Sequence, residues 1–321
     1  MARENDMTEF ARELAKAQKI AVFCHMRPDG DTLGAAGATY RILQALGKRA
    51  YIVCADPVPE KFLYWELYKN VHTEIPTGCD TFLAVDCSTE ERMGDAGYAF
   101  RTFRGRKFNI DHHISNTYYA DYNYVEERSA CCELIYELAV AMGITPDAVA
   151  AQSLLLGICT DSGSFSHSDV NERTLAIAAK LYGCGANMEE ISYNLFKKQT
   201  KVRMLLSNLT MPTMRFYHND RFSAIVVTKK NLERANALPS DSEGFVDYLL
   251  TVDTVEVAAC LMEMKPEQYK ISLRSKGPDV NAVASCYGGG GHVLASGCMI
   301  QGDLEEVLDK LSYTVGQYLE D

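Results

Sequence analysis

Short apolar runs recur in the first half of this chain, and they constrain its fold more than any other feature. They predict buried strands at residues 20–24, 50–54, 82–85 and 108–110. Three of them lead directly into His25, Asp86 and Asp111. Apolar residues at helical spacing predict helices at residues 8–17, 33–43, 130–141, 147–157 and 171–182. This alternation predicts an α/β fold with a mostly parallel sheet flanked by helices. Ligands bind at the carboxyl ends of such strands, so we expect one site there.

Local signals predict where two of these helices begin or end. Gly47 fits the position just after the helix at 33–43, where a left-handed residue commonly ends a helix. Thr145 and Pro146 fit an N-cap and a first-turn proline for the helix at 147–157.

The character of the sequence changes near residue 190, which predicts a second domain. Because lysine and arginine are frequent between Asn194 and Arg203, we interpret 191–213 as a helical linker. It would join a catalytic domain (1–190) to a smaller C-terminal α/β domain (214–321), with the active site in a cleft between them. Within the second domain we expect a strand, a helix, a hairpin and a last helix at residues 222–228, 245–252, 255–274 and 304–318. Residues 240–243 fit a capping box for the first of these helices.

Charge and cysteine usage limit the functions that are open to the chain. The formal net charge of −11 argues against a protein that coats long nucleic acid, which needs many lysine and arginine contacts to phosphates. A small anionic substrate, held by metal ions or by a local cationic site, stays open. Eleven cysteines without a CxxC pair are typical of reduced thiols in a cytoplasmic protein. We expect neither a secretory signal nor a membrane span of roughly 18–20 apolar residues.

Four clusters of carboxylates and imidazoles supply groups that bind metal ions. They are His25 with Asp29 and Asp31, then Asp86, then Asp111-His112-His113, and finally Asp161. We expect all four clusters at the carboxyl ends of strands. Mixed imidazole and carboxylate ligands suit Mn²⁺, Zn²⁺ or Fe²⁺, and cations relieve the repulsion between close carboxylates. Six ligands can serve two ions if one carboxylate bridges, and ions about 3.5–4 Å apart are common in phosphoester hydrolysis.

Each of these elements also has a simpler interpretation. An aspartate at a strand end often caps a turn or a helix, and a single histidine is often structural. We assign that structural role to His72, His167 and His218, which lie outside the clusters. The basic residues between 101 and 107 suggest a phosphate patch, but a solvated turn before a strand is the more typical interpretation.

With these clusters in place, the sequence resembles the DHH phosphoesterase family. The matching segments, in the family's order, are HMRPDGDTLG (25–34), VDCS (85–88), NIDHHISN (109–116), TDSGSF (160–165) and GGGGHVLASG (288–297). The last segment resembles the DHH-associated domain of the branch that includes nanoRNases, cyclic-dinucleotide phosphodiesterases and RecJ-type exonucleases. It does not resemble the C-terminal domain of the family's pyrophosphatases.

The resemblance implies a role for each candidate residue. One divalent ion would bind His25, Asp29 and Asp86. A second would bind Asp31, Asp86, His112 and Asp161. The family's usual ion is Mn²⁺, while the ligand set alone leaves Zn²⁺ and Fe²⁺ open. Asp86 would bridge the ions, Asp111 would orient an imidazole, and His113 would lie near the scissile phosphate. These three residues are the catalytic candidates.

The C-terminal domain would supply the substrate-binding residues Arg274, Gly289, Gly290, Gly291 and His292. Glycines let backbone N–H groups approach a phosphate closely, and a flexible loop is the alternative interpretation of this run. Lys276 is more typical of a solvated hairpin charge than of a substrate contact.

On this resemblance we expect an enzyme that hydrolyses short RNA oligomers to mononucleotides and converts pAp (adenosine 3′,5′-bisphosphate) to AMP. One alternative is a phosphodiesterase for cyclic or linear dinucleotides, such as c-di-AMP, pApA or pGpG. A minor alternative is a non-catalytic nucleotide sensor. We expect a cytoplasmic protein, with a homodimer suggested by the family.

Overall fold

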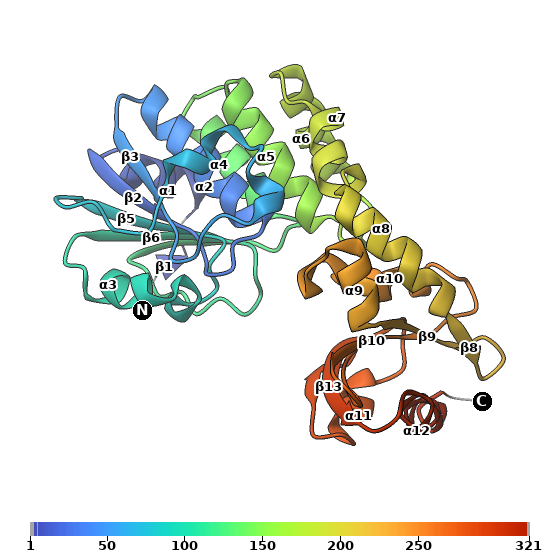
Figure 1. Ribbon diagram of the computed structural model, residues 1–321. Coiled ribbons are helices and arrows are strands. Elements are labelled where there is room, and N and C mark those ends of the chain that lie inside the picture. The colour runs from blue at the N-terminus through green and yellow to red at the C-terminus, as the bar shows by residue number, and fades with distance from the viewer. Residues whose placement is uncertain (1–2, 5, 320–321) are drawn as a thin grey trace. The chain divides into compact units, whose positions relative to one another are not determined.

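The computed structural model describes residues 3–4 and 6–319, and the chain forms two compact units (Figure 1). The first comprises Met1–Lys198 and the second Gln199–Asp321. The division falls inside the stretch 191–213 that we interpret as a linker, while the limits of the domains and a cleft between them stay predictions. Among the described residues, no cluster of buried hydrophobic side chains draws on both units. Each unit therefore has its own core.

A seven-stranded parallel sheet forms the centre of the first unit. Its order is β1-β7-β6-β5-β2-β3-β4, and its strands are β1 (Arg3–Glu4), β2 (Lys19–Phe23), β3 (Arg49–Val53), β4 (Val71–His72), β5 (Thr81–Val85), β6 (Arg106–Asp111) and β7 (Tyr122–Val125). The four predicted strands are confirmed to within two residues. The sequence pattern does not reveal β1, β4 and β7, because these strands are too short to show a periodicity.

The strand order reverses between β2 and β5. From this pair, β3 and β4 follow on one side of the sheet, and β6 and β7 follow on the other. The carboxyl ends of the strands at such a switch point are where parallel sheets bind ligands. Asp86 comes directly after β5, and His25 lies in the turn that follows β2. The fold therefore places two of the predicted site residues at this position.

Helices cover both faces of this sheet (Figure 1). One face packs against α1 (Met7–Leu14), α2 (Gly30–Ala45), α4 (Cys131–Ala141) and α5 (Ala148–Asp161), with α6 (Glu172–Gly183) and α7 (Met188–Ser192) adding to the same core. The other face packs against α3 (Asp95–Thr102). Its contacts are aromatic: the rings of Phe23 and Phe100 meet edge to face, with their centroids 5.5 Å apart. Both faces of the parallel sheet are therefore buried, which explains its nearly continuous apolar strands.

A six-stranded mixed sheet forms the centre of the second unit. Its order is β12-β13-β11-β10-β9-β8, with the strands β8 (Arg215–Tyr217), β9 (Phe222–Val227), β10 (Val257–Lys265), β11 (Gln268–Ser275), β12 (Gly290–His292) and β13 (Ala295–Gln301). The predicted hairpin is the antiparallel pair β10–β11, whereas β9 and β10 run parallel. One sheet face packs against α11 (Val280–Ser285) and α12 (Leu304–Gly316), and the other against α8 (Lys201–Thr210), α9 (Lys229–Ala235) and α10 (Phe245–Leu250). The predicted fold class is confirmed.

Two of the predicted helix starts are wrong, although the predicted end at Gly47 is confirmed by its positive φ of 72°. Helix α5 is capped by Asp147, whose carboxylate accepts a hydrogen bond from the N–H of Ala150, so Thr145 and Pro146 lie outside the helix. A carboxylate two residues further on outcompetes the threonine hydroxyl, because it also interacts favourably with the helix dipole.

The predicted capping box at 240–243 is also wrong. Three of its residues lie in a separate short 3-10 helix, η6 (Pro239–Ser242), in which Asp241 accepts a hydrogen bond from the N–H of Leu238. Helix α10 instead starts after Gly244, which has a positive φ of 77°. The capping signal is genuine, but it belongs to the preceding turn.

Among the described residues, no helix is both long and apolar enough to cross a membrane. All eleven cysteines are free thiols, and most of them are buried.

Candidate active site

The first group of metal-binding side chains surrounds the end of β2. Nδ1 of His25 lies 2.8 Å from the carbonyl oxygen of Met26, so this nitrogen carries the proton and donates it. Nε2 therefore faces the carboxylates, 3.4 Å from Oδ2 of Asp29 and 3.4 Å from Oδ2 of Asp86. Asp29 is held in place because it caps α2 with its other oxygen, accepting from the N–H groups of Asp31 and Thr32.

The second group surrounds His112, which follows β6. Nδ1 of His112 lies 2.9 Å from the carbonyl oxygen of Arg128, and Nε2 faces the carboxylates in the same way as in His25. Nε2 is 3.3 Å from Oδ1 of Asp86, 3.5 Å from Oδ2 of Asp161 and 3.9 Å from Oδ2 of Asp31. Fixing one imidazole nitrogen on a backbone carbonyl is a common way to aim the other at a metal ion.

Asp86 lies between the two groups and faces both. Its Oδ2 points toward His25 and its Oδ1 toward His112, and the side chain is only 2% exposed. The residue has a positive φ of 56°, and its N–H donates to the carbonyl oxygen of Ile110. Aspartate tolerates this left-handed conformation better than most residues. The turn at the end of β5 therefore directs one carboxylate at two imidazoles.

Asp31 is fully buried, and its carboxylate both caps a helix and faces the candidate metal site. Its carboxylate accepts hydrogen bonds from the N–H groups of Cys131 and Cys132, so it caps α4 from the first turn of α2. The residue that precedes α4, Ala130, offers no side-chain cap of its own. The same carboxylate faces His112. The packing of α2 against α4 thus fixes a candidate metal ligand.

Asp161 corrects one expectation about the site. It is not at the end of a strand but is the last residue of α5. It still reaches the site because α5 packs closely on α2, where a Cβ on Gly157 would lie 2.6 Å from Oδ1 of Asp31. The structure therefore brings together all six predicted metal ligands, five from the turns and helix starts that follow strands and one from a helix end.

The crowding of these groups shifts their pKa values strongly. Burial raises the pKa of Asp161 to about 9 and that of Asp31 to about 7, and neighbouring carboxylates add to both shifts. Burial alone would lower the pKa of each imidazole, but the close carboxylates outweigh it and raise the pKa of His25 to about 10 and that of His112 to about 11. Burial would likewise raise the pKa of Asp86, but the two imidazoles lower it well below its ordinary value. Protons hold this cluster together when no cation does.

The donor set fits divalent metal ions. Two buried atoms, Oδ1 of Asp86 and Nε2 of His112, lack a hydrogen-bond partner among the described residues although they face each other. Buried polar atoms are rarely left unpaired, and a shared cation would satisfy both. The candidate donor atoms of His25, Asp29 and Asp86 lie within 4.8 Å of one another, as do those of Asp31, His112 and Asp161.

His113 lies beside this cluster and is held by a chain of hydrogen bonds. Its Nδ1 is 2.8 Å from Oδ1 of Asp111, and Oδ2 of Asp111 accepts from the amide of Asn116 at 2.7 Å. Asp111 is fully buried, whereas the side chain of His113 is 38% exposed. The hydrogen bond to Asp111 raises the pKa of His113. Among the described residues, no hydrogen bond or ion pair involves the other ring nitrogen, Nε2, so it can contact a ligand. Sequence reasoning missed Asn116, although its place at the end of the NIDHHISN segment was a signal.

The candidate substrate-binding residues lie near the β12 end of the C-terminal sheet. Arg274 on β11 and His292 on β12 both pair with Ala295 on β13, the strand between them, so their side chains lie on the same face of the sheet. The glycine run departs from expectation, because the N–H groups of Gly289 and Gly291 already donate to Ala284 and Asn281. A Cβ on Gly289 would lie 2.2 Å from the carbonyl oxygen of Gly297. These glycines permit close strand packing more than they offer free amides.

The remaining histidines and basic residues make contacts within the fold. His167 and His218 lie within hydrogen-bond distance of backbone carbonyl oxygens, those of Asp161 and Ser312. Arg101 forms ion pairs with Glu90 and Glu91, and Arg106 donates to the carbonyl oxygen of Glu13. Lys276 donates to the carbonyl oxygens of Val252 and Asp253.

Comparison with known proteins agrees with this geometry. Two family models match the chain: the DHH family N-terminal domain over residues 19–160, and the DHHA1 domain over residues 223–321. A bifunctional oligoribonuclease and PAP phosphatase NrnA of Thermus thermophilus is 30% identical, covering 94% of this chain and 90% of that protein. The chain belongs to the DHH family. This membership makes it a metal-dependent phosphoesterase, as the sequence predicts.

Two further proteins are similar to this chain over nearly their whole length. The bifunctional oligoribonuclease and PAP phosphatase NrnA of Bacillus subtilis is 27% identical, covering 91% of this chain and 93% of that protein. The crystal structure of an exopolyphosphatase-related protein from Bacteroides fragilis has a TM-score of 0.82 with 25% identity, covering 97% of this chain and 96% of that one.

Proposed function

We propose that this chain hydrolyses short oligoribonucleotides to mononucleotides and converts pAp to AMP. The observation that carries the proposal is the shared carboxylate of Asp86, whose two oxygens face two separate groups of metal-binding side chains. The similarity of the chain to oligoribonuclease and PAP phosphatase relatives, over more than nine tenths of its length, supports the choice of substrates.

In this proposal each ion has its own set of ligands. The first would be held by His25, Asp29 and Asp86, and the second by Asp31, Asp86, His112 and Asp161. Two such ions polarise phosphoryl oxygens and lower the pKa of water, which supplies a nucleophile near neutral pH. Four carboxylates nearly cancel the charge of two divalent ions, so the substrate's own negative charge needs further positive groups. We favour Mn²⁺ because it is the usual ion of the DHH family, and the mixed imidazole and carboxylate donors are compatible with it.

His113 would supply one of these positive groups. Its Nδ1 is bound by Asp111, so only Nε2 is free to reach a substrate. Because Asp111 raises the pKa of this imidazole, the protonated form is favoured, and Nε2–H would donate to a phosphoryl oxygen. Asp111 would orient His113 and stabilise its charge.

The C-terminal domain would bind the nucleotide. Arg274 and His292 lie on one face of the sheet, on the two strands that flank β13, and can both contact a phosphate. Gly289, Gly290 and Gly291 would let the substrate approach the strand closely, since they carry no side chains.

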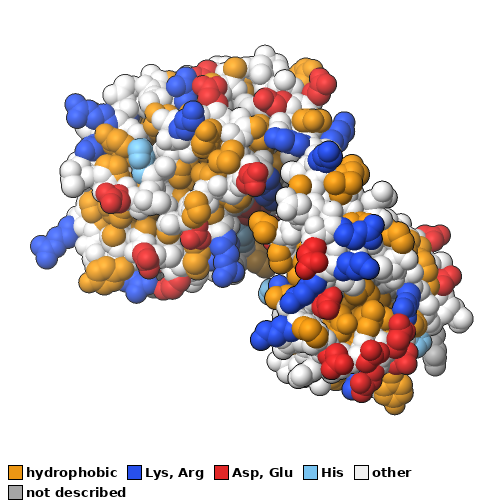
Figure 2. Space-filling model, in the orientation of Figure 1, with side chains coloured by type: hydrophobic (Ala, Val, Ile, Leu, Met, Phe, Trp, Pro, Cys, Tyr) orange, Lys and Arg blue, Asp and Glu red, His pale blue; other side chains and the backbone are white. Residues whose placement is uncertain are grey.

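A short substrate agrees with the surface of the protein. The net charge is −11, and basic and acidic side chains are interspersed on the visible face of the first unit (Figure 2). A long nucleic acid would need a continuous series of basic contacts. We also propose a cytoplasmic location, for which the eleven free thiols are the support. A homodimer stays a prediction.

The test is to offer the Mn²⁺-loaded protein short RNA, pAp, c-di-AMP, pApA and pGpG and to follow the products. We expect mononucleotides from RNA and AMP from pAp, with turnover abolished by a chelator. Hydrolysis of the dinucleotides alone would replace the proposal by the dinucleotide phosphodiesterase alternative. Metal-dependent turnover of none of these substrates would refute it.

The Asp86→Ala variant tests the bridging role. Because both ions lose a ligand, we expect turnover to fall by at least about a hundredfold. Asp95→Ala is the matched control and should keep its activity. It removes an exposed carboxylate from α3, which covers the face of the sheet opposite to α2 and α5. Substantial activity in Asp86→Ala would show that this carboxylate does not bridge.

A further inference from the structure

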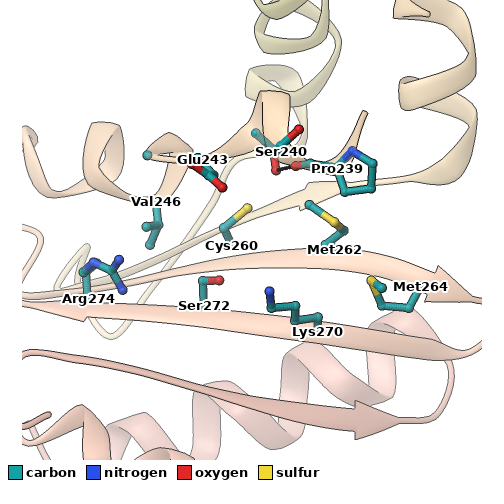
Figure 3. A pocket seen from close by; sticks show the side chains of 12 residues that line it. Pro239, Ser240, Glu243, Val246, Cys260, Met262, Met264, Lys270, Ser272 and Arg274 are labelled. Atoms are coloured by element: carbon teal, nitrogen blue, oxygen red, sulfur yellow. Dashed lines mark hydrogen bonds between the residues drawn. The ribbon is translucent and has the colours of Figure 1, made fainter. Parts of the chain in front are cut away.

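A pocket of about 490 Å³ lies on the C-terminal sheet, and of its lining residues only Arg274 has a role in the function proposed above (Figure 3). Its floor consists of side chains from β10 and β11, and its opposite wall is formed by η6 and the start of α10. The volume falls within the usual range for small-molecule sites, which is roughly 300–1,000 Å³.

The floor combines soft apolar groups with polar ones. The strand register places Cys260 opposite Ser272 and Met262 opposite Lys270, so these four side chains share one face of the hairpin. Figure 3 shows them directed toward the segment that carries Ser240 and Glu243. Sulfur atoms make favourable contacts with aromatic rings, so this floor suits a flat ring.

The opposite wall is held in position. The side chain of Arg203 on α8 donates to the carbonyl oxygen of Asp241 at 2.7 Å, and its guanidinium lies over the ring of Phe245. The hydroxyl of Ser242 donates to the carbonyl oxygen of Pro239. These contacts fix the turn from which Glu243 projects, so the pocket does not depend on an unsupported loop.

Two charged groups of the pocket have no partner within the fold. Among the described residues, no ion pair or side-chain hydrogen bond involves the ammonium of Lys270 or the carboxylate of Glu243. One group can bind an anion, and the other accepts hydrogen bonds only. Both residues are exposed and therefore accessible to a ligand, and a ligand that contacts both would carry a negative charge and hydrogen-bond donors.

The pocket is continuous with the candidate substrate site. Arg274, Ser272 and Lys270 alternate along β11 on the same face, and all three line the pocket. Four residues of a strand span about 13 Å. Long side chains at both ends of this distance can contact phosphates on either side of one nucleoside. The Nε of Arg274 is 3.5 Å from the carboxylate of Asp247, and such an exposed ion pair is weak enough for a phosphate to replace it.

We propose that this pocket binds a second nucleoside of a short RNA chain, next to the nucleotide whose phosphate Arg274 contacts. Its base lies on Cys260 and Met262, and Glu243 accepts hydrogen bonds from amino groups of the base. Lys270 contacts the phosphate beyond it. Adenine, cytosine and guanine offer an amino group for this contact. Uracil offers only its N3–H, which lies between two carbonyl oxygens that repel a carboxylate, so the pocket disfavours uracil. This inference rests on the oligoribonuclease function proposed above and adds selectivity for base and length.

The test compares kcat/KM of the Mn²⁺-loaded protein for triadenylate, triuridylate and pAp. Homotrimers carry the same base at every position, so the direction of binding does not matter. In Lys270→Ala we expect selectivity for triadenylate over pAp to fall about tenfold, through KM, because a charge-assisted contact is lost. In Glu243→Gln we expect the preference for triadenylate over triuridylate to fall about fivefold, because glutamine both donates and accepts. Lys310→Ala, on α12 against the other sheet face, is the control and should leave both ratios unchanged.

Ratios in both variants within twofold of the unmodified protein would overturn the second nucleoside site while the proposed function stood. Failure of the unmodified protein to hydrolyse any of the three substrates would overturn the proposed function, and this inference with it.

Discussion

In the proposed function Asp111 acts on the substrate only through His113, and this makes its expected contribution separable. Replacing Asp111 with Asn keeps an acceptor beside Nδ1 but removes the charge that raises the pKa of His113. If protonated His113 assists the reaction, the alkaline limb of the kcat profile moves to lower pH, because the imidazole loses its proton earlier. We expect kcat to fall about tenfold as well. The measurement is kcat against pH for both proteins.

Asn116→Ala is the companion variant, because it keeps the charge of Asp111 and removes the amide that holds its Oδ2. A loss of kcat without a shift of the alkaline limb is expected there. The same profile in both variants would show that Asp111 acts through position alone.

The protonation of the metal-free cluster predicts that metal binding releases protons. At pH 7.5, raised pKa values keep Asp161, His25 and His112 largely protonated, since they lie at about 9, 10 and 11. A metal ion binds only the carboxylate and the neutral imidazole, so these protons must leave. Affinity for Mn²⁺ should therefore rise with pH across the neutral range.

Calorimetric titration with Mn²⁺ in two buffers of different ionisation enthalpy measures this release. We expect about two protons or more for each protein molecule saturated, since three groups must lose one. Binding heats that do not depend on the buffer would contradict the prediction.

The sequence located the candidate ligands because most of them follow strands, where chain direction alone gathers them. It could not locate Asp161 correctly, since a helix end reaches the site only through the packing of α5 on α2. The capping of α4 by Asp31 joins residues that are 100 positions apart, and no local pattern reveals it. The glycines were expected to let backbone N–H groups approach a phosphate, but the N–H groups of Gly289 and Gly291 donate to Ala284 and Asn281 instead. Local chemistry was predictable, and contacts between distant elements were not.

At the scale of elements, the contact between α2 and α5 depends on glycine. A Cβ on Gly34 would lie 2.3 Å from the carbonyl oxygen of Ser153, which is backbone and cannot move aside easily. We expect Gly34→Ala to lower the free energy of unfolding by about 2–3 kcal/mol, as overpacking a buried contact does. Because Asp31 and Asp161 lie on these two helices, Mn²⁺ affinity should fall too. Denaturant unfolding and Mn²⁺ titration measure the two effects.

Gly183→Ala is the control for helix propensity. Gly183 is the last residue of α6, and nothing lies within 4 Å of an added Cβ. Alanine there should be neutral or stabilising by about 0.5 kcal/mol. Equal stability changes in the two variants would show that the α2–α5 contact tolerates the methyl group.

The elements themselves were largely predictable because their apolar spacing is regular over several turns or residues. The long helices and the four longer strands of the first sheet were found from this spacing. Helix starts were less certain, since more than one polar side chain can cap. Thr145 and Asp147 compete for α5, and the aspartate wins. Which face of a sheet each helix covers depends on the complete set of packing partners, which no window of sequence contains.

For the whole molecule, separate cores predict separate responses to metal. All six candidate ligands belong to Met1–Lys198, and the core of Gln199–Asp321 is built from other residues. We therefore expect two calorimetric unfolding transitions. Mn²⁺ should raise the midpoint temperature of the transition that belongs to the first unit and leave the other unchanged. Ligand at about a thousand times its Kd stabilises by about 4 kcal/mol, which corresponds to a shift on the order of 10 °C for a unit of this size. Asp86→Ala should abolish the shift while keeping both transitions. A shift of equal size in both transitions, or one that persists in Asp86→Ala, would show that Mn²⁺ stabilises the protein at some place other than this cluster.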